Sequence, residues 1–257
     1  MSAPSVPLSF QLPLDHPPGA ARGVPQWTTS VGGERVVLHA MRALEWPRER
    51  TLFVADVHFG KAAAFRAAGV PLPRGSTASD LHRLDALIAH ANAACVVVLG
   101  DFLHAKSGRV GALTRAFVAW RVRNANVDVV LVRGNHDARA GDPPPEWRVR
   151  CVDAPYPLPP FLACHHVEKP RTGYALCGHL HPAVRIASGG DSARLPCFVL
   201  GRERAILPAF GRFTGMADVA PAHDERIVAI AGDALFELPP LSQNCNGGLP
   251  FVGPANA

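Results

Sequence analysis

Several features that would assign the chain to a specialised class of proteins are missing from its sequence. Among its 257 residues, no apolar run approaches the roughly 18 residues that a membrane-spanning helix needs. The 23 glycines and 25 prolines follow no period, which excludes a collagen-like fibre. The N-terminal segment has no basic stretch followed by an apolar one, so no secretory signal is expected. We therefore expect a folded cytoplasmic protein that contacts no membrane.

Cysteine motifs are absent and lysine is scarce. None of the six cysteines belongs to a CxxC pair and most lie in apolar runs, so we expect small buried side chains rather than disulfides or a zinc ribbon. Only three of the 26 basic residues are lysines, and the formal net charge is +5. The planar guanidinium of arginine binds phosphate well, which is compatible with a nucleic acid or phosphate ester as ligand. A GC-rich genome that favours arginine codons accounts for the same bias.

The hydrophobic pattern predicts a single α/β domain. Residues 1–27 predict an irregular arm, residues 28–240 the folded domain, and residues 241–257 a flexible tail. Strands are predicted in the first half at residues 35–39, 51–55, 95–99 and 127–132. Helical patterns lie between them at residues 61–68, 77–92 and 110–124. After residue 142 only short strands are predicted, at residues 161–164, 174–177, 195–199, 227–230 and 235–238.

Potential metal ligands follow five of these strands and include seven of the twelve histidines. In chain order they are Asp56, His58, Asp101, His104, Asn135, His136, His165, His166, His179 and His181. Ligands of open α/β sheets bind beyond the carboxyl ends of the strands. A single Asp-x-His or Gly-His-x-His occurs by chance in many proteins, where the Asp is often a turn or cap residue. Five such groups, each placed after a strand, predict a functional site.

The spacing and chemistry of these groups favour a metal centre. Residues two apart on extended backbone point to the same side, so each Asp-x-His or His-x-His pair is expected to reach one ion. Glycines before Asp101, Asn135 and His179 allow close approach of the backbone. Carboxylate, amide and imidazole ligands without thiolates suit Mn²⁺, Fe²⁺ or Zn²⁺. Two divalent ions beside two carboxylates leave a net charge of about +2, which attracts a phosphate.

The ordered motifs DVH, GD, GNHD, H and GHLH resemble those of the calcineurin-like metallophosphoesterase superfamily over roughly residues 35–210. The resemblance implies a four-layer β-sandwich flanked by helices, with a dinuclear metal centre. It implies that one ion is bound by Asp56, His58 and His181. It implies that the other is bound by Asn135, His165 and His179. Asp101 would bridge the two ions and count among the catalytic residues.

Two histidines of these motifs leave alternatives open. His136 matches the position that in the family is thought to protonate the leaving group or steady the transition state. The alternative is an imidazole packed in the turn. In the HH pair, His165 fits the ligand position, and alternation of side chains would turn His166 to the opposite face.

A narrower resemblance is carried by residues 55–75 (ADVHFGKAAAFRAAGVPLPRG), 100–104 (GDFLH) and 207–215 (LPAFGRFTG). These segments are similar to those of the bacterial ligase-associated DNA-damage-response endonucleases. The resemblance implies a DNA substrate, with a DNA ligase or helicase of a repair complex as a partner.

Lys61, Arg66 and Arg74 are candidates to contact substrate phosphates, or else form a solvated helix face. His104 either orients a ligand or phosphate, or is an ordinary loop histidine.

Together these features predict an enzyme that hydrolyses phosphodiester bonds with two divalent ions. Mn²⁺ is the preferred ion and Fe²⁺ or Zn²⁺ the alternatives. A DNA endonuclease acting in repair is the favoured function. A phosphomonoesterase or cyclic-nucleotide phosphodiesterase with a small substrate would use the same ligands. A non-catalytic scaffold of a repair complex is disfavoured because no ligand position is lost.

Overall fold

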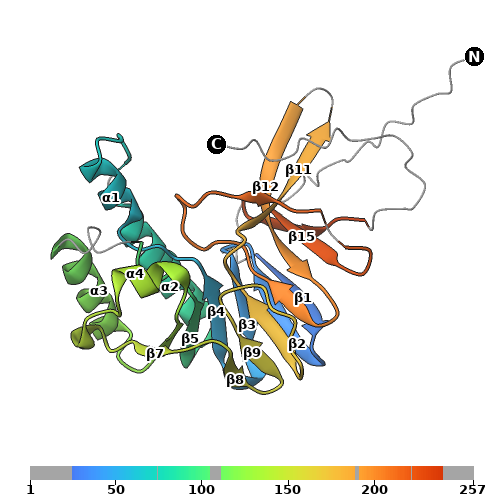
Figure 1. The fold of residues 1–257 in the computed structure, drawn as a ribbon, viewed down its shortest axis with the longest axis horizontal. Coiled ribbons are helices and arrows are strands. Elements are labelled where there is room, and N and C mark those ends of the chain that lie inside the picture. Colours follow the sequence, from blue (N-terminus) through green and yellow to red (C-terminus); the bar gives the residue numbers. More distant parts are fainter. Residues whose placement is uncertain (1–24, 74, 105–110, 189–190, 221, 240–257) are drawn as a thin grey trace, which may run out of the picture.

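The computed structural model of the protein describes residues 25–239 except 74, 105–110, 189–190 and 221 (Figure 1). The predicted tail 241–257, most of the predicted arm 1–27, Arg74 and Cys245 lie outside the described residues. The first strand begins at Gln26, two residues before the predicted start of the domain at residue 28.

Strands and helices alternate in the first half of the described chain, and short strands fill the second. The first half contains β1 (Gln26–Val31), β2 (Glu34–His39), β3 (Ala43–Trp46), β4 (Thr51–Ala55), α1 (Lys61–Ala67), α2 (Ser76–Ala91), β5 (Cys95–Leu99), α3 (Gly111–Arg123), β6 (Asp128–Val132) and α4 (Asn135–Ala140). The second half contains β7 (Arg150–Val152), β8 (Tyr156–Leu158), β9 (Phe161–Ala163), β10 (Tyr174–Cys177), β11 (Pro182–Ser188), β12 (Asp191–Leu200), β13 (Arg204–Ile206), β14 (Ala217–Asp218), β15 (Arg226–Ala231) and β16 (Ala234–Glu237). Short 3-10 helices cover Pro47–Glu49 and Pro145–Trp147.

The strands form two mixed sheets. The first is seven-stranded, in the order β1-β2-β3-β4-β5-β6-β7, and its strands β4 to β7 are parallel. The second is nine-stranded, in the order β14-β11-β12-β13-β10-β9-β8, with β15 paired to β12 and β16 paired to β15. In the second sheet, β10 runs parallel to both β9 and β13. Parallel neighbours end at the same edge of a sheet, so the polar segments that follow them are brought together.

The core follows from the alternation of side chains along each strand. Leu52 and Val54 of β4 are buried against the apolar sides of α2 and α3. Phe53 and Ala55 of the same strand are buried against the second sheet. Both faces of this strand are therefore covered, which explains its continuous apolar sequence.

Helices α2, α3 and α4 pack on the outer face of the first sheet, whereas α1 contributes no residue to this cluster and projects away from the sheet (Figure 1). The predicted α/β sandwich of two sheets flanked by helices is confirmed. The outer face of the second sheet buries Cys177 and Val199 beneath strand side chains such as Val184 and Phe236. The second half has apolar runs too short and too often interrupted by proline to form a long helix. No helix among the described residues combines the length and hydropathy that crossing a membrane requires.

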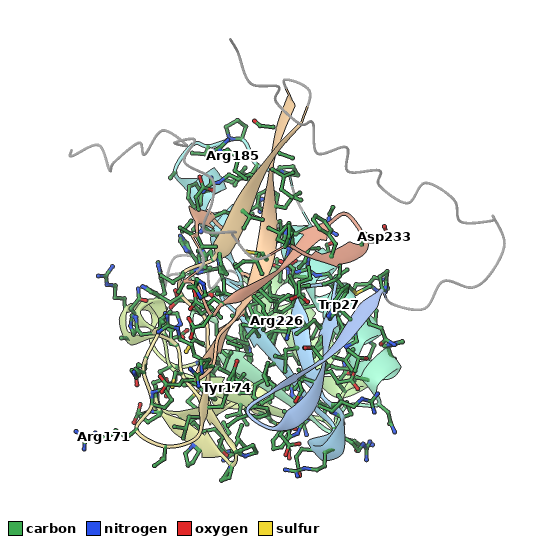
Figure 2. The ribbon with its side chains drawn as sticks, turned by 90° about the vertical axis from the view of Figure 1, so that its right-hand side faces the viewer. Trp27, Arg171, Tyr174, Arg185, Arg226 and Asp233 are labelled. Atoms are coloured by element: carbon green, nitrogen blue, oxygen red, sulfur yellow. The ribbon has the colours of Figure 1, made fainter. Side chains whose placement is uncertain are left out.

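The hairpin β15–β16 connects the second sheet to β1 of the first (Figure 2). Arg226 on β15 forms an ion pair with Glu237 on β16 at 2.7 Å. Its guanidinium also donates a hydrogen bond to the hydroxyl of Thr29 on β1 at 3.2 Å. Trp27 packs nearby against the cluster between the two sheets. The first strand is thereby held by both sheets.

The cysteines of the described chain are free. Cys164, Cys177 and Cys197 are buried, as predicted, whereas Cys95 and Cys151 are only half-buried. Burial raises the pKa of the Cys197 thiol to about 12, which keeps it protonated and unreactive at neutral pH.

Candidate metal centre

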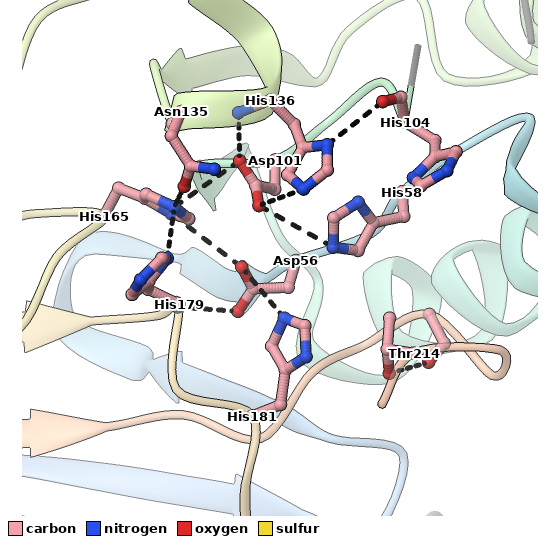
Figure 3. A network of polar contacts seen from close by, with 12 residues as sticks. Asp56, His58, Asp101, His104, Asn135, His136, His165, His179, His181 and Thr214 are labelled. Atoms are coloured by element: carbon pink, nitrogen blue, oxygen red, sulfur yellow. Dashed lines mark hydrogen bonds and ion pairs between the residues drawn. The ribbon is translucent and has the colours of Figure 1, made fainter. Parts of the chain in front are cut away.

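Polar side chains from five strand ends meet at one edge of the sandwich (Figure 3). The strands concerned are β4, β5 and β6 of the first sheet and β9 and β10 of the second. The cluster contains every predicted metal ligand: Asp56, His58, Asp101, Asn135, His165, His179 and His181. Residues more than 100 positions apart in the chain are thus neighbours, as in the 2.9 Å hydrogen bond from the His179 N–H to Asp56 Oδ2.

The backbone at these ligands is strained. The φ angles are positive at Asp56 (52°), His58 (50°), Asp101 (52°), His179 (69°) and His181 (49°). Such angles are uncommon for residues other than glycine and cost on the order of 1–3 kcal/mol each. The expectation that extended backbone aligns each pair is therefore wrong. The chain turns sharply at each of these five ligands, and the surrounding fold holds the turn.

Glycines leave room for these ligands, as predicted. A Cβ on Gly100 would lie 2.0 Å from His165 Nδ1, and one on Gly134 would lie 2.4 Å from Asp101 Oδ1. A Cβ on Gly178 would lie 2.7 Å from a carbonyl oxygen of β5. Each of these glycines is thus required by the close approach of a ligand or a neighbouring strand.

Gly100→Ala is expected to reduce metal binding as well as stability. Its φ is 77°, so a side chain costs roughly 1–2 kcal/mol in backbone energy alone, and the clash displaces His165. Gly69→Ala is the matched control, because Gly69 has a φ of 86° but no atom within 4 Å of its Cβ position. Denaturant unfolding and metal content of both variants test this. Equal metal content in the two variants would contradict it.

The first group of potential ligands comprises Asp56, His58 and His181, whose ligand atoms lie within 4.8 Å of one another. His181 Nε2 lies 3.4 Å from Asp56 Oδ1. His181 Nδ1 donates to the carbonyl oxygen of Gly215 at 3.0 Å. In the neutral ring this hydrogen bond leaves the lone pair on Nε2, directed toward Asp56.

The second group is centred on His165. Its Nε2 lies 2.9 Å from Asn135 Oδ1 and 3.1 Å from His179 Nδ1. Its Nδ1 donates to the carbonyl oxygen of Leu99 at 3.1 Å. As in the first group, this hydrogen bond to the backbone leaves the Nε2 lone pair toward the site.

Asp101 lies between the two groups. Its Oδ2 is 3.7 Å from His58 Nε2, and its Oδ1 is 3.4 Å from His165 Nε2. The carboxylate is buried, and Oδ1 accepts a hydrogen bond from the His136 N–H at 2.9 Å. One carboxylate oxygen therefore faces each group.

The arrangement of these atoms fits cations. The lone pair of His165 Nε2 faces the oxygens of Asn135 and Asp101, which offer no proton. In the first group, Asp56 Oδ1 and His181 Nε2 are buried without a hydrogen-bond partner among the described residues. Buried acceptors that face one another are unfavourable unless a cation lies between them. Both groups can therefore hold a divalent ion.

Burial favours the neutral, metal-binding form at two of these imidazoles, His58 and His179. It lowers the pKa of His58 to about 2, assisted by the charge of Lys61 and by neighbouring histidines. Burial is also the main cause that lowers the pKa of His179. At His181, burial is outweighed by the adjacent carboxylate and carbonyl, which raise its pKa. A metal ion at His181 therefore competes with a proton, and its binding becomes more favourable as the pH rises.

Comparison with known proteins decides the family. Residues 49–181 match the family model described as calcineurin-like phosphoesterase. The chain belongs to the calcineurin-like phosphoesterase family. A crystal structure of the Pseudomonas putida nuclease MPE is similar, with 39% sequence identity and a TM-score of 0.74. The match covers 83% of this chain and 100% of that chain. No curated protein matches the sequence.

Membership of the family makes the chain a hydrolase of ester bonds that uses divalent metal ions. The sequence resemblance to this superfamily is thereby confirmed. The predicted calcineurin-like fold is confirmed by the same comparisons.

His136 lies at the rim of the phosphoesterase site. Its Nδ1 donates to the carbonyl oxygen of His104 at 3.1 Å, and its Nε2 lies 3.9 Å from Asp101 Oδ2. The side chain is 32% exposed, so a substrate can reach it. His104 stacks on the same ring at a centroid distance of 5.3 Å. His104 therefore orients His136 through both its carbonyl and its ring.

Sequence reasoning missed the structural role of Asp137. Its buried carboxylate accepts hydrogen bonds from the N–H groups of Gly134 (2.9 Å), Phe102 (3.0 Å) and Leu103 (3.2 Å). Asp137 thereby joins two segments of the site. The loop after β5 carries Asp101, and the start of α4 carries Asn135 and His136. An acidic residue three positions after a helix N-cap is a capping-box signal that indicates this role.

Segment 209–215 is the second element whose structural role in the site the sequence did not indicate, since its sequence offers only Arg212 as a candidate for the site and favours a surface turn there. The Phe210 N–H donates to the last carbonyl of β4 at 2.7 Å, and the Gly211 N–H donates to the Asp56 carbonyl at 3.2 Å. Gly215 accepts from His181, as described above. The segment therefore supports two ligands of the first group, and only the folded chain brings it there.

The predicted phosphate-binding cations are placed differently from one another. Lys61 lies beside the centre, where burial lowers its pKa although Asp101 and Asp56 partly oppose that effect. Arg66 instead donates to the carbonyl oxygens of Pro73 at 2.9 Å and Leu72 at 3.5 Å. Arg66 thus closes the loop after α1.

His166 lies on the same side as the ligands, contrary to the expectation from alternation. Its ring centroid is 4.3 Å from that of His179 and 4.8 Å from that of His165. Strand β9 ends at Ala163, so the alternation of an extended strand does not reach the histidine pair. The two differ in exposure, since His165 is buried and His166 is exposed.

Proposed function

We propose that this phosphoesterase cleaves phosphodiester bonds of DNA with two divalent metal ions. The observation that carries the proposal is the similarity to a nuclease over the whole length of that chain, at 39% identity. A second support is the position of Asp101 between two separate ligand groups. Ions roughly 3.5–4 Å apart are typical of phosphatases and nucleases.

In this proposal Asp56, His58 and His181 hold one ion, Asn135, His165 and His179 hold the other, and Asp101 contacts both. Mn²⁺ is the proposed ion because the ligands mix oxygen and imidazole nitrogen without thiolate. The bound ions would lower the pKa of water and neutralise charge on the phosphate. The backbone hydrogen bonds of His165 and His181 hold their rings in the tautomer that binds metal.

His136 is the proposed proton donor to the leaving oxygen. The carbonyl of His104 fixes its Nδ1 proton, and its other nitrogen faces the site beside Asp101. The exposure of the ring allows contact with an extended substrate.

A cytoplasmic role in DNA repair, with a ligase or helicase partner, is proposed from the resemblance of residues 55–75, 100–104 and 207–215.

A phosphomonoesterase or a cyclic-nucleotide phosphodiesterase is the alternative, since all three activities can use the same ligands. We expect the Mn²⁺-loaded protein to hydrolyse bis-p-nitrophenyl phosphate and DNA, and to lose both activities after chelation. Single- and double-stranded DNA, p-nitrophenyl phosphate and a cyclic nucleotide complete the substrate panel. Turnover of the monoester alone, or of the cyclic nucleotide without DNA, would overturn the nuclease proposal.

A further inference from the structure

A shallow hollow beside the metal centre is bordered by three separate segments. Val57, His58 and Lys61 lie on one side, Ser76, Thr77 and Asp80 of α2 on another, and Gly211 to Thr214 on the third. Its volume of about 10 Å³ corresponds to about one water molecule. The hollow can therefore admit a single oxygen atom of a ligand, but not a nucleobase.

Two cations of this hollow lack a partner. Within the described residues, neither Lys61 nor Arg212 forms an ion pair or side-chain hydrogen bond, although the charges of Asp101 and Asp56 act on Lys61 and that of Asp80 acts on Arg212. By contrast, Arg133 and Arg226 each pair with a carboxylate at 2.7 Å. Lys61 and Arg212 are carried by α1 and by the segment after β13, so the fold brings two cations without a direct carboxylate contact to one place.

The start of α2 adds to the positive potential. Its N-cap residue is Gly75, which provides no side-chain hydrogen bond, and its first turn contains no acidic residue. The first N–H groups of a helix have no partner within the helix and attract anions. Ser76 and Thr77, which border the hollow, carry N–H groups of this kind and also offer hydroxyl groups.

Asp80 is the carboxylate that borders the hollow, and it is already neutralised. Arg83 pairs with it at 3.2 Å, and the charges of Arg212 and Arg42 also act on it. Burial nevertheless raises the pKa of Asp80 to about 6, which weakens its opposing charge further near that pH. The hollow as a whole remains positive.

We propose that Lys61, Arg212 and the first turn of α2 bind the phosphate next to the scissile one in a polynucleotide. The inference rests on the proposed function and names a second anion site outside the metal ligands. A hollow that admits one phosphate oxygen contacts the backbone and not the bases, so it favours a polymer without selecting a sequence. Arg66, which is bound to its own loop, takes no part.

The test uses substrates in which the scissile bond is fixed. Thymidine p-nitrophenyl phosphate has one phosphate. The corresponding thymidine dinucleotide, esterified at its 5′ or 3′ end, adds a second phosphate whose cleavage releases no p-nitrophenol, so only the ester bond is measured. A methylphosphonate at that second position is the uncharged control. The measured quantity is the ratio of kcat/KM for dinucleotide over mononucleotide.

With the wild type, we expect kcat/KM to be roughly 10-fold or more higher for the dinucleotide than for the mononucleotide. This gain should appear for only one of the two dinucleotides, either the 5′ or the 3′ ester. The methylphosphonate, Lys61→Met and Arg212→Gln should each remove most of this gain. Arg202→Gln, which removes an exposed charge at the end of β12, is the matched control and should keep it. Because each ratio is internal to one variant, a change in the rate on the mononucleotide does not affect it.

DNA binding by the metal-free protein provides a second measurement. Each lost phosphate contact should reduce the slope of log Kd against log salt by about 0.7–0.9. The anion site would be wrong if, with the wild type, the phosphate and methylphosphonate dinucleotides gave the same gain in kcat/KM. It would also be wrong if Arg202→Gln lost as much of this gain as Lys61→Met or Arg212→Gln. Hydrolysis of the mononucleotide without any cleavage of DNA would instead overturn the proposed function.

Discussion

Asp101→Ala is expected to lose both metal ions and to reduce phosphodiesterase activity at least about 1000-fold. One carboxylate oxygen of Asp101 faces each ligand group. Oδ2 lies 3.7 Å from His58 Nε2, and Oδ1 lies 3.4 Å from His165 Nε2. Removing the carboxylate leaves His58 and His165 without the shared negative charge. Bound ions contribute several kcal/mol to the transition state, and each 1.36 kcal/mol is a factor of ten in rate. Metal content by elemental analysis and kcat/KM on bis-p-nitrophenyl phosphate are the measurements.

Asp101→Asn separates the charge of this residue from its structural role. The amide keeps an oxygen that can accept the His136 N–H hydrogen bond, now 2.9 Å long, but supplies no negative charge. We expect a wild-type unfolding curve together with weak binding of metal. Two ions and full activity in Asp101→Ala would show that the shared site is assigned wrongly.

His136→Ala is expected to slow DNA cleavage by roughly 10²–10⁴-fold while both ions remain bound. The imidazole is oriented by the His104 carbonyl and is partly exposed, as a proton donor to a substrate must be. The loss should be smaller on bis-p-nitrophenyl phosphate, because p-nitrophenolate leaves without needing a proton. Single-turnover rates on both substrates, with metal content measured in parallel, test this expectation.

His82→Ala is the control for this substitution, since His82 is exposed on α2. It should retain the wild-type rate on both substrates. If His136→Ala lost metal, His136 would be a ligand. If the loss were equal on the two substrates, the ring would stabilise charge and not donate the proton.

Much of the α/β arrangement, including one strand of the second half, could be predicted from local pattern. The strands at residues 51–55, 95–99 and 174–177 are observed with the predicted bounds as β4, β5 and β10. Helices α1 and α2 begin or end within one residue of their predicted limits. These elements are continuous apolar strands or amphipathic helices, whose periodicity is strong.

Other elements could not be predicted because their pattern is weak. Strand β1 alternates between exposed and half-buried residues and contains no continuous apolar run. Strand β3 has four residues, and α4 has six, which is too short for a helical period to be recognised. The hairpin β11–β12 was predicted only in part, since Pro182 and Pro196 interrupt its pattern.

The sequence by itself determined the chemistry of the candidate centre. Five strand ends carrying carboxylate, amide and imidazole groups indicate a cation site wherever the strands are brought together. Glycines at positions 100, 134 and 178 indicated close approach there. These properties depend on residue type and local spacing, which the sequence contains.

Tertiary structure decided how these groups meet and what surrounds them. Left-handed backbone at Asp56 and His181 is unfavourable locally and is held only by contacts from distant segments such as 209–215. The tautomers of His165 and His181 depend on carbonyl groups of Leu99 and Gly215, which are remote in sequence. The placement of Lys61 and Arg212 at one hollow has the same origin. Local pattern contains no information on contacts between such distant residues, so the fold had to supply it.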